Sequence, residues 1–588
     1  MLFRELVSAS RQRLQGYSWL SQQPAMLVWA TVAGVLGALA TYFFYQGIHL
    51  FQLIFLGQAG EIDDVVSALP WWGRLLLPAL GGVAAGYILR ASSRFTADKP
   101  SDYMESVAIG DGQLSIRQGL LRSLSSLISV ASGGSIGREG AMVHLGALGA
   151  SVLGRFAPFN RSRLRLIVAC GAAAGVAAAY GAPIAGALFV AEIVLGTMAI
   201  HTVGPLLLAA AVSSFTVNAL GGHLLSYTLP PVPAFGIDAM LPMLVLGVCA
   251  GFGAPYFLKF LDLFRGAFKK TGWSEPWRLG LGGLLLGAIL VFMPLVAGNG
   301  YNVIASLLST SWPWHAVLLV LLLKLLATAL TVGSGAVGGV FTPTLFMGAV
   351  VGTLFGQALE WLFPGFALPM FVYAAVGMGA FLAAGTGAPL MAILMVFEMT
   401  HSYALVLPLM LACVLAYFVA RAVAEVAMYE VTLVRERDTH LRNRLRDTLI
   451  GDLIKPAVTV VATATPVKVV LQRFSEYPVR YWYVVDEDSI FQGVIAQQDV
   501  TGLLLGQGDI EVKTAADILR LDFVKPLHPD MSLDAAQDIF VNFTGERIPV
   551  VTHGDEPKLL GVVYKSALLE KYFALKKSLD SGGDSVHI

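Results

Sequence analysis

Long apolar segments separated by short polar ones dominate the chain up to about residue 430. One such segment runs from Pro24 to Phe51 and the next from Trp72 to Leu89, and both are long enough to cross a bilayer as helices. Gly or Pro interrupts many of these segments, and their lengths vary. That pattern is typical of the discontinuous helices of transporters. We therefore predict an all-α polytopic membrane domain with broken helices over residues 24–434.

Charged side chains are rare inside this region. From 166 to 258 and from 279 to 397, the only Asp, Glu, Lys or Arg residues are Glu192, Asp238, Lys324 and Glu360. Ionisable residues inside a membrane are costly, so each is a candidate for a specific role. For Lys324 we favour a simpler interpretation, in which the side chain snorkels toward an interface.

The membrane domain contains an internal repeat. Residues 171–192, GAAAGVAAAYGAPIAGALFVAE, align without gaps to residues 377–398, GMGAFLAAGTGAPLMAILMVFE, with 10 identities in 22 positions. Residues 132–146, SGGSIGREGAMVHLG, match 334–348, SGAVGGVFTPTLFMG, at nearly the same shift. Repeats of this kind place a transport site at the interface between the halves. We expect two inverted halves that meet near residues 265–280.

The stretch Ser132 to Ala150 predicts a helix start held deep in the membrane. Its glycines allow a tight turn that exposes backbone amides, and the apolar residues that follow continue as a helix. A helix N-terminus carries partial positive charge and free N–H donors, so it is a ready site for an anion. Glu139 is then an ionisable group beside an anion site.

After Ala427 the composition changes to that of a soluble module. A charged linker is followed by two similar units, each with a segment ending in Lys-Pro, a helix, an apolar strand, a turn, a strand that begins Gly-Val and a last helix. This β-α-β-β-α order, repeated twice, predicts an α+β pair. The predicted ranges are an amphipathic N-terminal segment 1–23, the membrane domain 24–434, a linker 435–450, the units 451–508 and 509–575, and a disordered tail 576–588.

Composition and charge narrow the class of function. Hydrophobic residues make up 56% of the 588 residues and charged ones 13%, against about 25% in soluble domains. The formal net charge is zero, so nothing indicates a nucleic-acid partner. The three cysteines are isolated, and no nucleophile, metal-ligand set or phosphate loop stands out. We expect membrane lipid as a partner, no resident cofactor or metal, and no enzyme activity.

Basic clusters orient the domain. Arg4, Arg11 and Arg13 precede the first span, and four arginines crowd residues 155–165. Since cytoplasmic loops carry an excess of Lys and Arg, we expect the N-terminus and, with the soluble tail, the C-terminus in the cytoplasm. We therefore predict a multi-pass protein of the cytoplasmic (inner) membrane.

Four motifs together resemble the CLC family of chloride channels and chloride/proton antiporters. They are GREG at 137–140, GVFTP at 339–343, the repeated GAP-to-Glu spacing and MYE at 428–430. The tail resembles the tandem CBS pair that many members carry. The resemblance implies a homodimer with one anion pathway per subunit. It also implies that Glu139 is the gate, which blocks the anion site when ionised and swings away when protonated. The anion-binding positions it implies are Gly137, Arg138, Gly140, Val340, Phe341 and Tyr429.

Three departures from the family pattern limit what the resemblance implies. The usual GSGxP serine is missing, and Ser101 beside Pro100 is the candidate in its place. Antiporters have two successive glutamates after the GAP segment, whereas here Glu192 precedes Ile193, which carries no proton. We favour a structural role for Glu192 over a proton role. In the CBS pair only Asp499 matches a nucleotide-binding position, so an adenine nucleotide there is a weak expectation and packing is at least as good an explanation.

The sequence thus predicts transport of chloride, and of other small anions, through a channel-like pathway gated by Glu139, either passive or gated by voltage or pH. A proton/chloride antiporter with a non-standard proton path is the first alternative. Inverted repeats and broken helices also suit a cation-driven symporter of an organic solute. A membrane sensor that responds to a ligand of the CBS pair is a third alternative.

Overall fold

The chain folds into two compact units, residues 1–433 and 434–588, and each is described by itself. The N-terminal residues 1–22, Ser101, most of the linker and the last seven residues of the predicted tail lie outside the described residues. The computed structural model describes residues 23–94, 102–108, 110–156, 159–222, 226–232, 236, 240–364, 368–424, 426, 428–429, 441, 444–477, 479–504, 513–521, 525–541, 543 and 545–581.

The first half of the helical unit begins with a long helix, α2. It ends with the short helix α9, its continuation η2, and the longer helix α10. Its elements are α2 (Gln23–Leu56), α3 (Ile62–Ala68), α4 (Trp71–Ser93), α5 (Tyr103–Ala108), α6 (Ile116–Ala131), α7 (Glu139–Phe156), α8 (Arg161–Tyr180), α9 (Pro183–Phe189), the π-helical continuation η2 (Val190–Leu195) and α10 (Ile200–Ala219).

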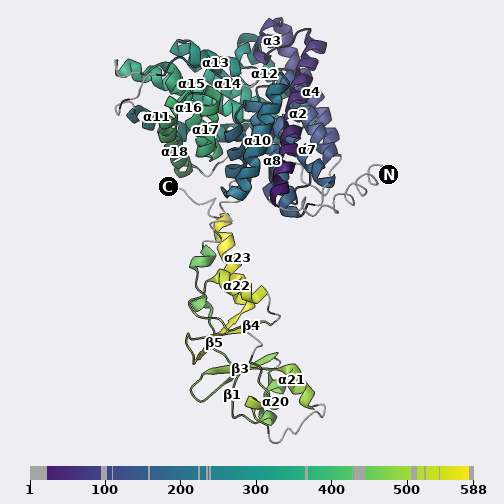
Figure 1. The fold of residues 1–588 in the computed structure, drawn as a ribbon, viewed down its shortest axis with the longest axis vertical. Coiled ribbons are helices and arrows are strands. Elements are labelled where there is room, and N and C mark those ends of the chain that lie inside the picture. The colour runs from purple at the N-terminus through teal and green to yellow at the C-terminus, as the bar shows by residue number, and fades with distance from the viewer. Residues whose placement is uncertain are drawn as a thin grey trace. The chain divides into compact units, whose positions relative to one another are not determined.

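The second half repeats this order of elements. It consists of α11 (Met240–Lys270), α12 (Glu275–Phe292), the short turn η4 (Pro294–Val296), α13 (Tyr301–Ser309), α14 (Trp314–Gly333), α15 (Phe341–Leu362), α16 (Met370–Thr386), α17 (Pro389–Thr400), the short turn η5 (Tyr403–Leu405) and α18 (Val406–Val423). In Figure 1 the first-half helices α2, α4, α7 and α8 lie on one side of the unit, and α13 to α16 lie on the other.

The boundary between the halves lies between α10 and α11. Helix α11 packs on α16 and α18 in the way that α2 packs on α8 and α10, so α11 is the counterpart of α2. The boundary expected near residues 265–280 is therefore wrong, because the basic cluster at the end of α11 lies inside the second half and not between the halves.

The GAP segments have the same conformation in both halves. Gly181 ends α8 at φ 65° and Gly387 ends α16 at φ 73°, in the left-handed region that glycine enters without steric cost. The following alanines, Ala182 and Ala388, precede α9 and α17 with almost equal dihedral angles. This match confirms the duplication predicted from the aligned segments.

Each half also caps a helix of the other half. The Glu192 carboxylate accepts hydrogen bonds from the backbone N–H groups of Leu390 and Met391 at 3.4 and 2.9 Å, at the start of α17. The Glu398 carboxylate accepts from Ile184 and Ala185 at 2.9 and 2.8 Å, at the start of α9. A carboxylate at a helix N-terminus satisfies free donors and the helix dipole. The exchange relates the two halves by an approximate twofold axis.

Close backbone contact joins α4 to α12 across the halves. A Cβ atom at Gly283 would lie 2.1 Å from the Pro78 carbonyl oxygen, and one at Gly82 would lie 2.4 Å from the Leu279 carbonyl oxygen. Small residues at four-residue spacing let membrane helices approach this closely, so that van der Waals contact holds the pair together.

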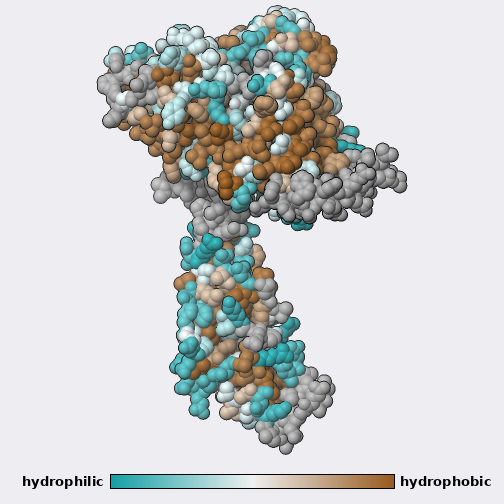
Figure 2. Space-filling view, viewed as in Figure 1, coloured by the Kyte–Doolittle hydropathy of each residue, from teal (hydrophilic) through white to brown (hydrophobic). Residues whose placement is uncertain are grey.

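The helical unit is a multi-pass membrane protein. Among the described residues, nine helices are long and apolar enough to cross a membrane. Large apolar side chains stand exposed on their outer faces, among them Phe43, Phe215 and Phe418. Figure 2 shows such side chains gathered over a broad area of this unit. A surface of this kind is stable in lipid and not in water.

The C-terminal unit contains two small sheets. The first has the order β1-β2-β3, with β1 (Val460–Ala462) parallel to β2 (Tyr481–Val485) and β2 antiparallel to β3 (Phe491–Ala496). The second pairs β4 (Arg547–Val551) with β5 (Leu559–Tyr564) in antiparallel register. Helices α20 (Val467–Glu476) and α21 (Gln497–Leu504) belong to the first repeat, and α22 (Leu533–Val541) and α23 (Lys565–Ser581) belong to the second. The predicted β-α-β-β-α order holds in the first repeat, whereas the second has α22, β4, β5 and α23, and its leading segment forms an isolated parallel bridge from Leu527 to Val550.

The two CBS-like repeats exchange their leading segments. Lys455, from the first Lys-Pro segment, exchanges backbone hydrogen bonds of 2.9 and 2.8 Å with Val562 of β5. Arg520, which lies in the second Lys-Pro segment (518–526), pairs with Val494 of β3. The sequence interpretation assigned each segment to the unit that follows it, whereas both pair across. The tail also differs from expectation, since α23 continues to Ser581 and residues 576–581 are helical.

We expect the reciprocal caps to stabilise the helical unit. Glu398→Ala leaves two N–H donors at the start of α9 unsatisfied, so the free energy of unfolding falls by about 1 kcal/mol. The change is measured as a lower midpoint temperature of thermal unfolding in detergent. Glu360→Ala, at an exposed position of α15, is the matched control and leaves the midpoint unchanged. Equal midpoints for both variants would contradict the capping role.

Candidate functional site

Two helices begin opposite each other at the centre of the candidate site. Helix α7 starts at Glu139 and α15 starts at Phe341. The turns before them are joined at Gly137 and Gly339, which exchange N–H···O hydrogen bonds of 2.8 and 2.9 Å. These glycines are equivalent in the repeat, 202 residues apart, as are the helices that follow them. Both N-termini therefore direct their free N–H groups toward one region.

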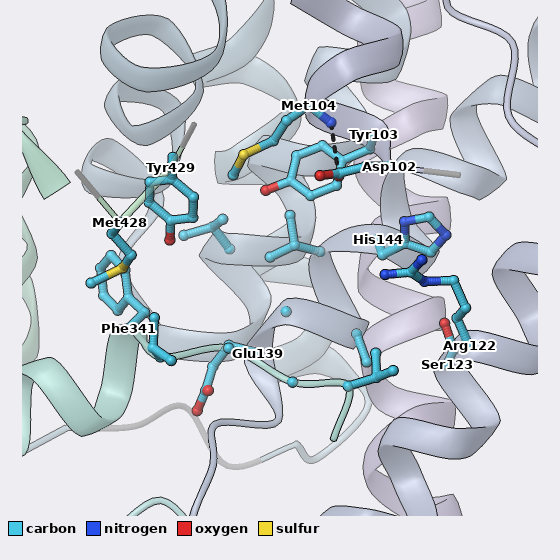
Figure 3. A pocket seen from close by; sticks show the side chains of 18 of the residues that line it. Asp102, Tyr103, Met104, Arg122, Ser123, Glu139, His144, Phe341, Met428 and Tyr429 are labelled. Atoms are coloured by element: carbon cyan, nitrogen blue, oxygen red, sulfur yellow. Dashed lines mark hydrogen bonds between the residues drawn. The ribbon is translucent and has the colours of Figure 1, made fainter. Parts of the chain in front are cut away.

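A cavity of about 260 Å³ lies beside these helix starts. Glu139, Gly140, Val340, Phe341 and Tyr429, all predicted from the sequence, line it together. Figure 3 shows the Tyr429 hydroxyl at the cavity wall near Phe341. The motifs GREG, GVFTP and MYE, which are up to 290 residues apart in the chain, thus meet at one place.

Aromatic side chains form the wall next to Phe341. The Phe341 ring lies 5.0 Å from that of Tyr180 and 6.1 Å from that of Phe189, and Phe189 lies 5.6 Å from Tyr429. The Tyr180 hydroxyl bonds to Oγ1 of Thr342 at 3.0 Å. The Met428 N–H donates to the Gly385 carbonyl at 3.0 Å, which fixes the segment that carries Tyr429. Packed phenol rings give the wall rigid, neutral hydrogen-bond donors.

The other end of the cavity is more polar. Asp102 accepts from the Met104 N–H at 3.1 Å and so orders the start of α5, where Tyr103 follows. The His144 ring of α7 lies 6.4 Å from that of Tyr103, and Arg122 of α6 lies beside His144 in Figure 3. An arginine at this end attracts small anions to the cavity. The candidate Ser101 lies outside the described residues, and the two residues that follow it, Asp102 and Tyr103, line the cavity.

The Glu139 side chain is almost fully buried, with 3% of its surface exposed. Oε1 accepts a hydrogen bond of 2.8 Å from the Tyr301 hydroxyl, and Oε2 has no hydrogen-bond partner among the described residues. Figure 3 shows the carboxylate directed away from Tyr429 and the middle of the cavity. In this conformation the carboxylate is bonded to Tyr301, which does not line the cavity.

Arg138 faces away from the cavity. Its guanidinium lies 3.2 Å from the Tyr45 hydroxyl and 3.5 Å from a Glu61 carboxylate oxygen, and it stacks 4.3 Å from the Tyr45 ring centre. Arg138 and Gly137 are not among the residues that line the cavity, so the expectation that they bind the anion stays a prediction. The Arg138 side chain contacts α2 through Tyr45 and the segment before α3 through Glu61.

The positions expected in a proton path also lie outside the cavity lining. Ile193 is buried in η2 with 1% of its surface exposed. Glu192 caps α17, as described above. The capping supports the structural role that the sequence interpretation favoured for Glu192.

Several cavity residues were missed from the sequence. Tyr180, Phe189, Tyr103, Arg122 and His144 line the cavity, and none was predicted as a site residue, although Tyr180, Phe189 and His144 lie within the aligned repeat segments. One signal was available for Arg122. It lies 15 residues before Gly137 (137 − 122), and Lys324 lies 15 residues before Gly339 (339 − 324), so the repeat places a cation at the same position in α6 and α14.

The CBS position Asp499 is engaged within the protein. Its carboxylate forms an ion pair with Arg520 and accepts from the Ala496 N–H at 3.3 Å. Across the described residues, no group of three or more His, Cys, Asp or Glu side chains is placed to hold a metal ion. Neither observation provides a resident cofactor site.

Comparison with known proteins agrees with the geometry. The model of the voltage gated chloride channel family matches residues 81–421, and the CBS domain model matches residues 450–506 and 515–574. A ClcB-like chloride channel protein of Ralstonia nicotianae is 48% identical over 422 residues, which cover 71% of this chain and 98% of the relative.

Solved structures show the same fold. A slow cyanobacterial Cl⁻/H⁺ antiporter superposes with a TM-score of 0.61 at 24% identity, covering 70% of this chain and 97% of that one. A CLC-type fluoride/proton antiporter gives a TM-score of 0.58 at 26% identity, covering 69% and 97%. The family consists of channels and transporters and not of enzymes. The chain therefore belongs to the voltage gated chloride channel (CLC) family and carries two CBS domains after its membrane unit.

Proposed function

We propose that the chain conducts chloride and other small anions through the cavity between α7 and α15, and that Glu139 is the gate. The observation that carries this proposal is the meeting of two helix N-termini at the Gly137–Gly339 bridge with a buried carboxylate beside them. Each helix start contributes partial positive charge worth about 0.3–1 kcal/mol toward an anion. Binding of this strength is weak enough for the anion to leave again, as fast passage requires.

The Glu139 carboxylate competes with the permeating anion. When ionised, it is itself an anion within reach of the helix starts, and it blocks the pathway by binding there. Protonation removes that charge, so the side chain turns away and chloride enters. The conformation with the carboxylate directed to Tyr301 corresponds to the open gate.

We infer that conduction is passive and not coupled to protons. Ile193 occupies the position of the internal proton acceptor and cannot be protonated, while the neighbouring Glu192 caps α17. The runner-up is proton/chloride antiport by a different path, which the likeness to the CLC-type fluoride/proton antiporter favours. The organic-solute symporter and the CBS-based sensor have less support, because the two helix starts at the cavity provide backbone N–H groups that suit a small anion.

Location and assembly follow the same proposal. We place the protein in the cytoplasmic membrane with both termini in the cytoplasm, because the arginines before and within α8 mark a cytoplasmic connection. The resemblance to the CLC family favours a homodimer in which each subunit has its own pathway and the outer faces contact membrane lipid.

For the tail we propose a packing role without a bound adenine nucleotide. The Asp499 carboxylate, which would meet a ribose hydroxyl, is already paired with Arg520. Because the leading segment of each repeat pairs with a strand of the other, each repeat depends on the other for its packing.

Coupling is tested by the chloride reversal potential of proteoliposomes under an imposed proton gradient at fixed chloride. We expect the potential to stay at the chloride equilibrium value, because the chain has no carboxylate at Ile193 to carry protons from the inside. A potential that moves with the proton gradient would establish antiport. An absence of chloride flux would reject the anion pathway.

The gate is tested by Glu139→Ala. Wild-type chloride flux is expected to rise as pH falls, because the protonated fraction of a carboxylate above its pKa grows about tenfold per pH unit. In Glu139→Ala the flux should be high and independent of pH, and Glu139→Gln should behave alike. Glu360→Ala is the control that keeps the wild-type profile. A Glu139→Ala protein with the wild-type pH dependence would falsify the gating role.

The nucleotide proposal is tested on the full-length protein with a fluorescent ATP analogue. We expect no saturable binding. Asp499→Ala should lower the stability of the tail by up to about 1 kcal/mol, the value of a partly exposed ion pair, and ATP should not change the unfolding midpoint of either protein. Saturable binding that ATP competes away would overturn this proposal.

A further inference from the structure

Tyr301 makes the single recorded hydrogen bond to the gate carboxylate within the described residues. Both side chains are almost fully buried, Tyr301 with 4% of its surface exposed. Tyr301 does not line the anion cavity, whereas the rest of Glu139 does. The hydroxyl therefore binds the carboxylate from outside the pathway. A buried carboxylate with one donor and one unpartnered oxygen depends strongly on that donor.

The structure holds Tyr301 in place from both sides. Lys324, which we had interpreted as snorkelling, is fully buried, and its ammonium donates to the carbonyls of Val296 and Gly298 at 3.0 and 2.7 Å. These carbonyls belong to the turn that leads into α13. On the other side, the Asn302 amide donates to carboxylates of α3, at 3.0 Å in each case. The phenol is thus a fixed donor and not a mobile one.

The acids of α3 that hold Asn302 are themselves well placed. Asp63 is buried with Asp64 beside it, and burial, followed by the charge of Asp64, raises the pKa of Asp63 to about 6. Asp63 also lies close enough to Lys324 for their charges to interact. The two anchors of Tyr301 are therefore coupled to each other.

Arg138 supports the ring of the same tyrosine. Its guanidinium carbon lies 5.6 Å from the Tyr301 ring centre and is held by Tyr45 and Glu61. A guanidinium over a phenol ring is attracted by the ring quadrupole. Arg138 therefore helps to position the Tyr301 ring, whose hydroxyl binds the carboxylate of the next residue, Glu139.

We propose that Tyr301 is a positioning residue that holds the Glu139 carboxylate outside the pathway and so sets the open fraction of the anion gate. This inference rests on the proposed gating role of Glu139. The gate has two competing sites, the helix starts inside the pathway and the Tyr301 hydroxyl outside it. Removal of the hydroxyl weakens only the outer site.

The test is Tyr301→Phe, which deletes one oxygen atom and keeps the ring. At neutral pH, chloride flux into proteoliposomes should fall about tenfold or more, the factor expected for loss of a hydrogen bond to a charged carboxylate. At acid pH the effect should be smaller, because the protonated carboxyl has lost its attraction to the helix starts. The midpoint of the pH profile should move to lower pH.

Tyr227→Phe is the matched control. Tyr227 is also buried, its ring centre lies 6.5 Å from that of Tyr301, and its hydroxyl has no hydrogen-bond partner among the described residues. It does not line the cavity. This variant should keep the wild-type pH profile, so a profile changed equally by both substitutions would assign the effect to general packing and overturn the proposal.

A third protein separates this inference from the proposed function. In a Glu139→Ala background, Tyr301→Phe should change nothing, because the group it positions is gone. An equal loss of flux in that background would mean that Tyr301 acts without the gate, and a wild-type profile for Tyr301→Phe alone would also reject the inference. Both of those results leave the gating role of Glu139 intact. Loss of the gating role would instead be seen in Glu139→Ala alone.

Discussion

The hydrogen-bonded pair of Gly137 and Gly339 is the constraint on which the membrane unit depends. Two equivalent residues of a duplicated chain exchange both of their backbone hydrogen bonds, and no side chain fits between them, since a Cβ at Gly137 would lie 2.9 Å from the Gly339 carbonyl oxygen. Because the bridge fixes the turns before α7 and α15, it also fixes the two helix starts relative to each other. A short backbone contact thereby brings the partial positive charges of two helix starts close together.

The same twofold relation governs the rest of the unit. Glu192 and Glu398 cap helices of opposite halves, and α4 packs on its counterpart α12 through glycine contacts. The relation also places a cationic side chain at the same position in each half, Arg122 in α6 and Lys324 in α14. The two side chains have different roles. Arg122 lines the cavity, while Lys324 fixes the turn that leads to Tyr301. Duplication supplied the scaffold, and each half then specialised.

Local patterns in the sequence predicted much of this structure. Side-chain contacts between residues far apart in the chain could not be predicted from it. The GAP turns and the GREG and GVFTP helix starts follow from glycine and proline chemistry, which acts over a few residues. Tyr301 left no signal, because a lone tyrosine after an apolar segment is more often core. The role of Lys324 was predicted wrongly because its partners are backbone carbonyls. Every residue has a carbonyl, so the sequence does not indicate which ones bind the ammonium. The crossed Lys-Pro segments were missed since strand pairing depends on spatial neighbours and not on chain order.

Because of these crossed segments, the two repeats depend on each other when the chain is truncated. Lys455 completes the sheet of the second repeat, and Arg520 completes that of the first, so neither repeat contains all of its own sheet. A premature stop between the repeats would leave one sheet without its added segment and one segment without a sheet. The exposed strand edges would then be open to pairing with other chains. Evolution can therefore remove this module as a whole or keep it as a whole, but cannot shorten it by half.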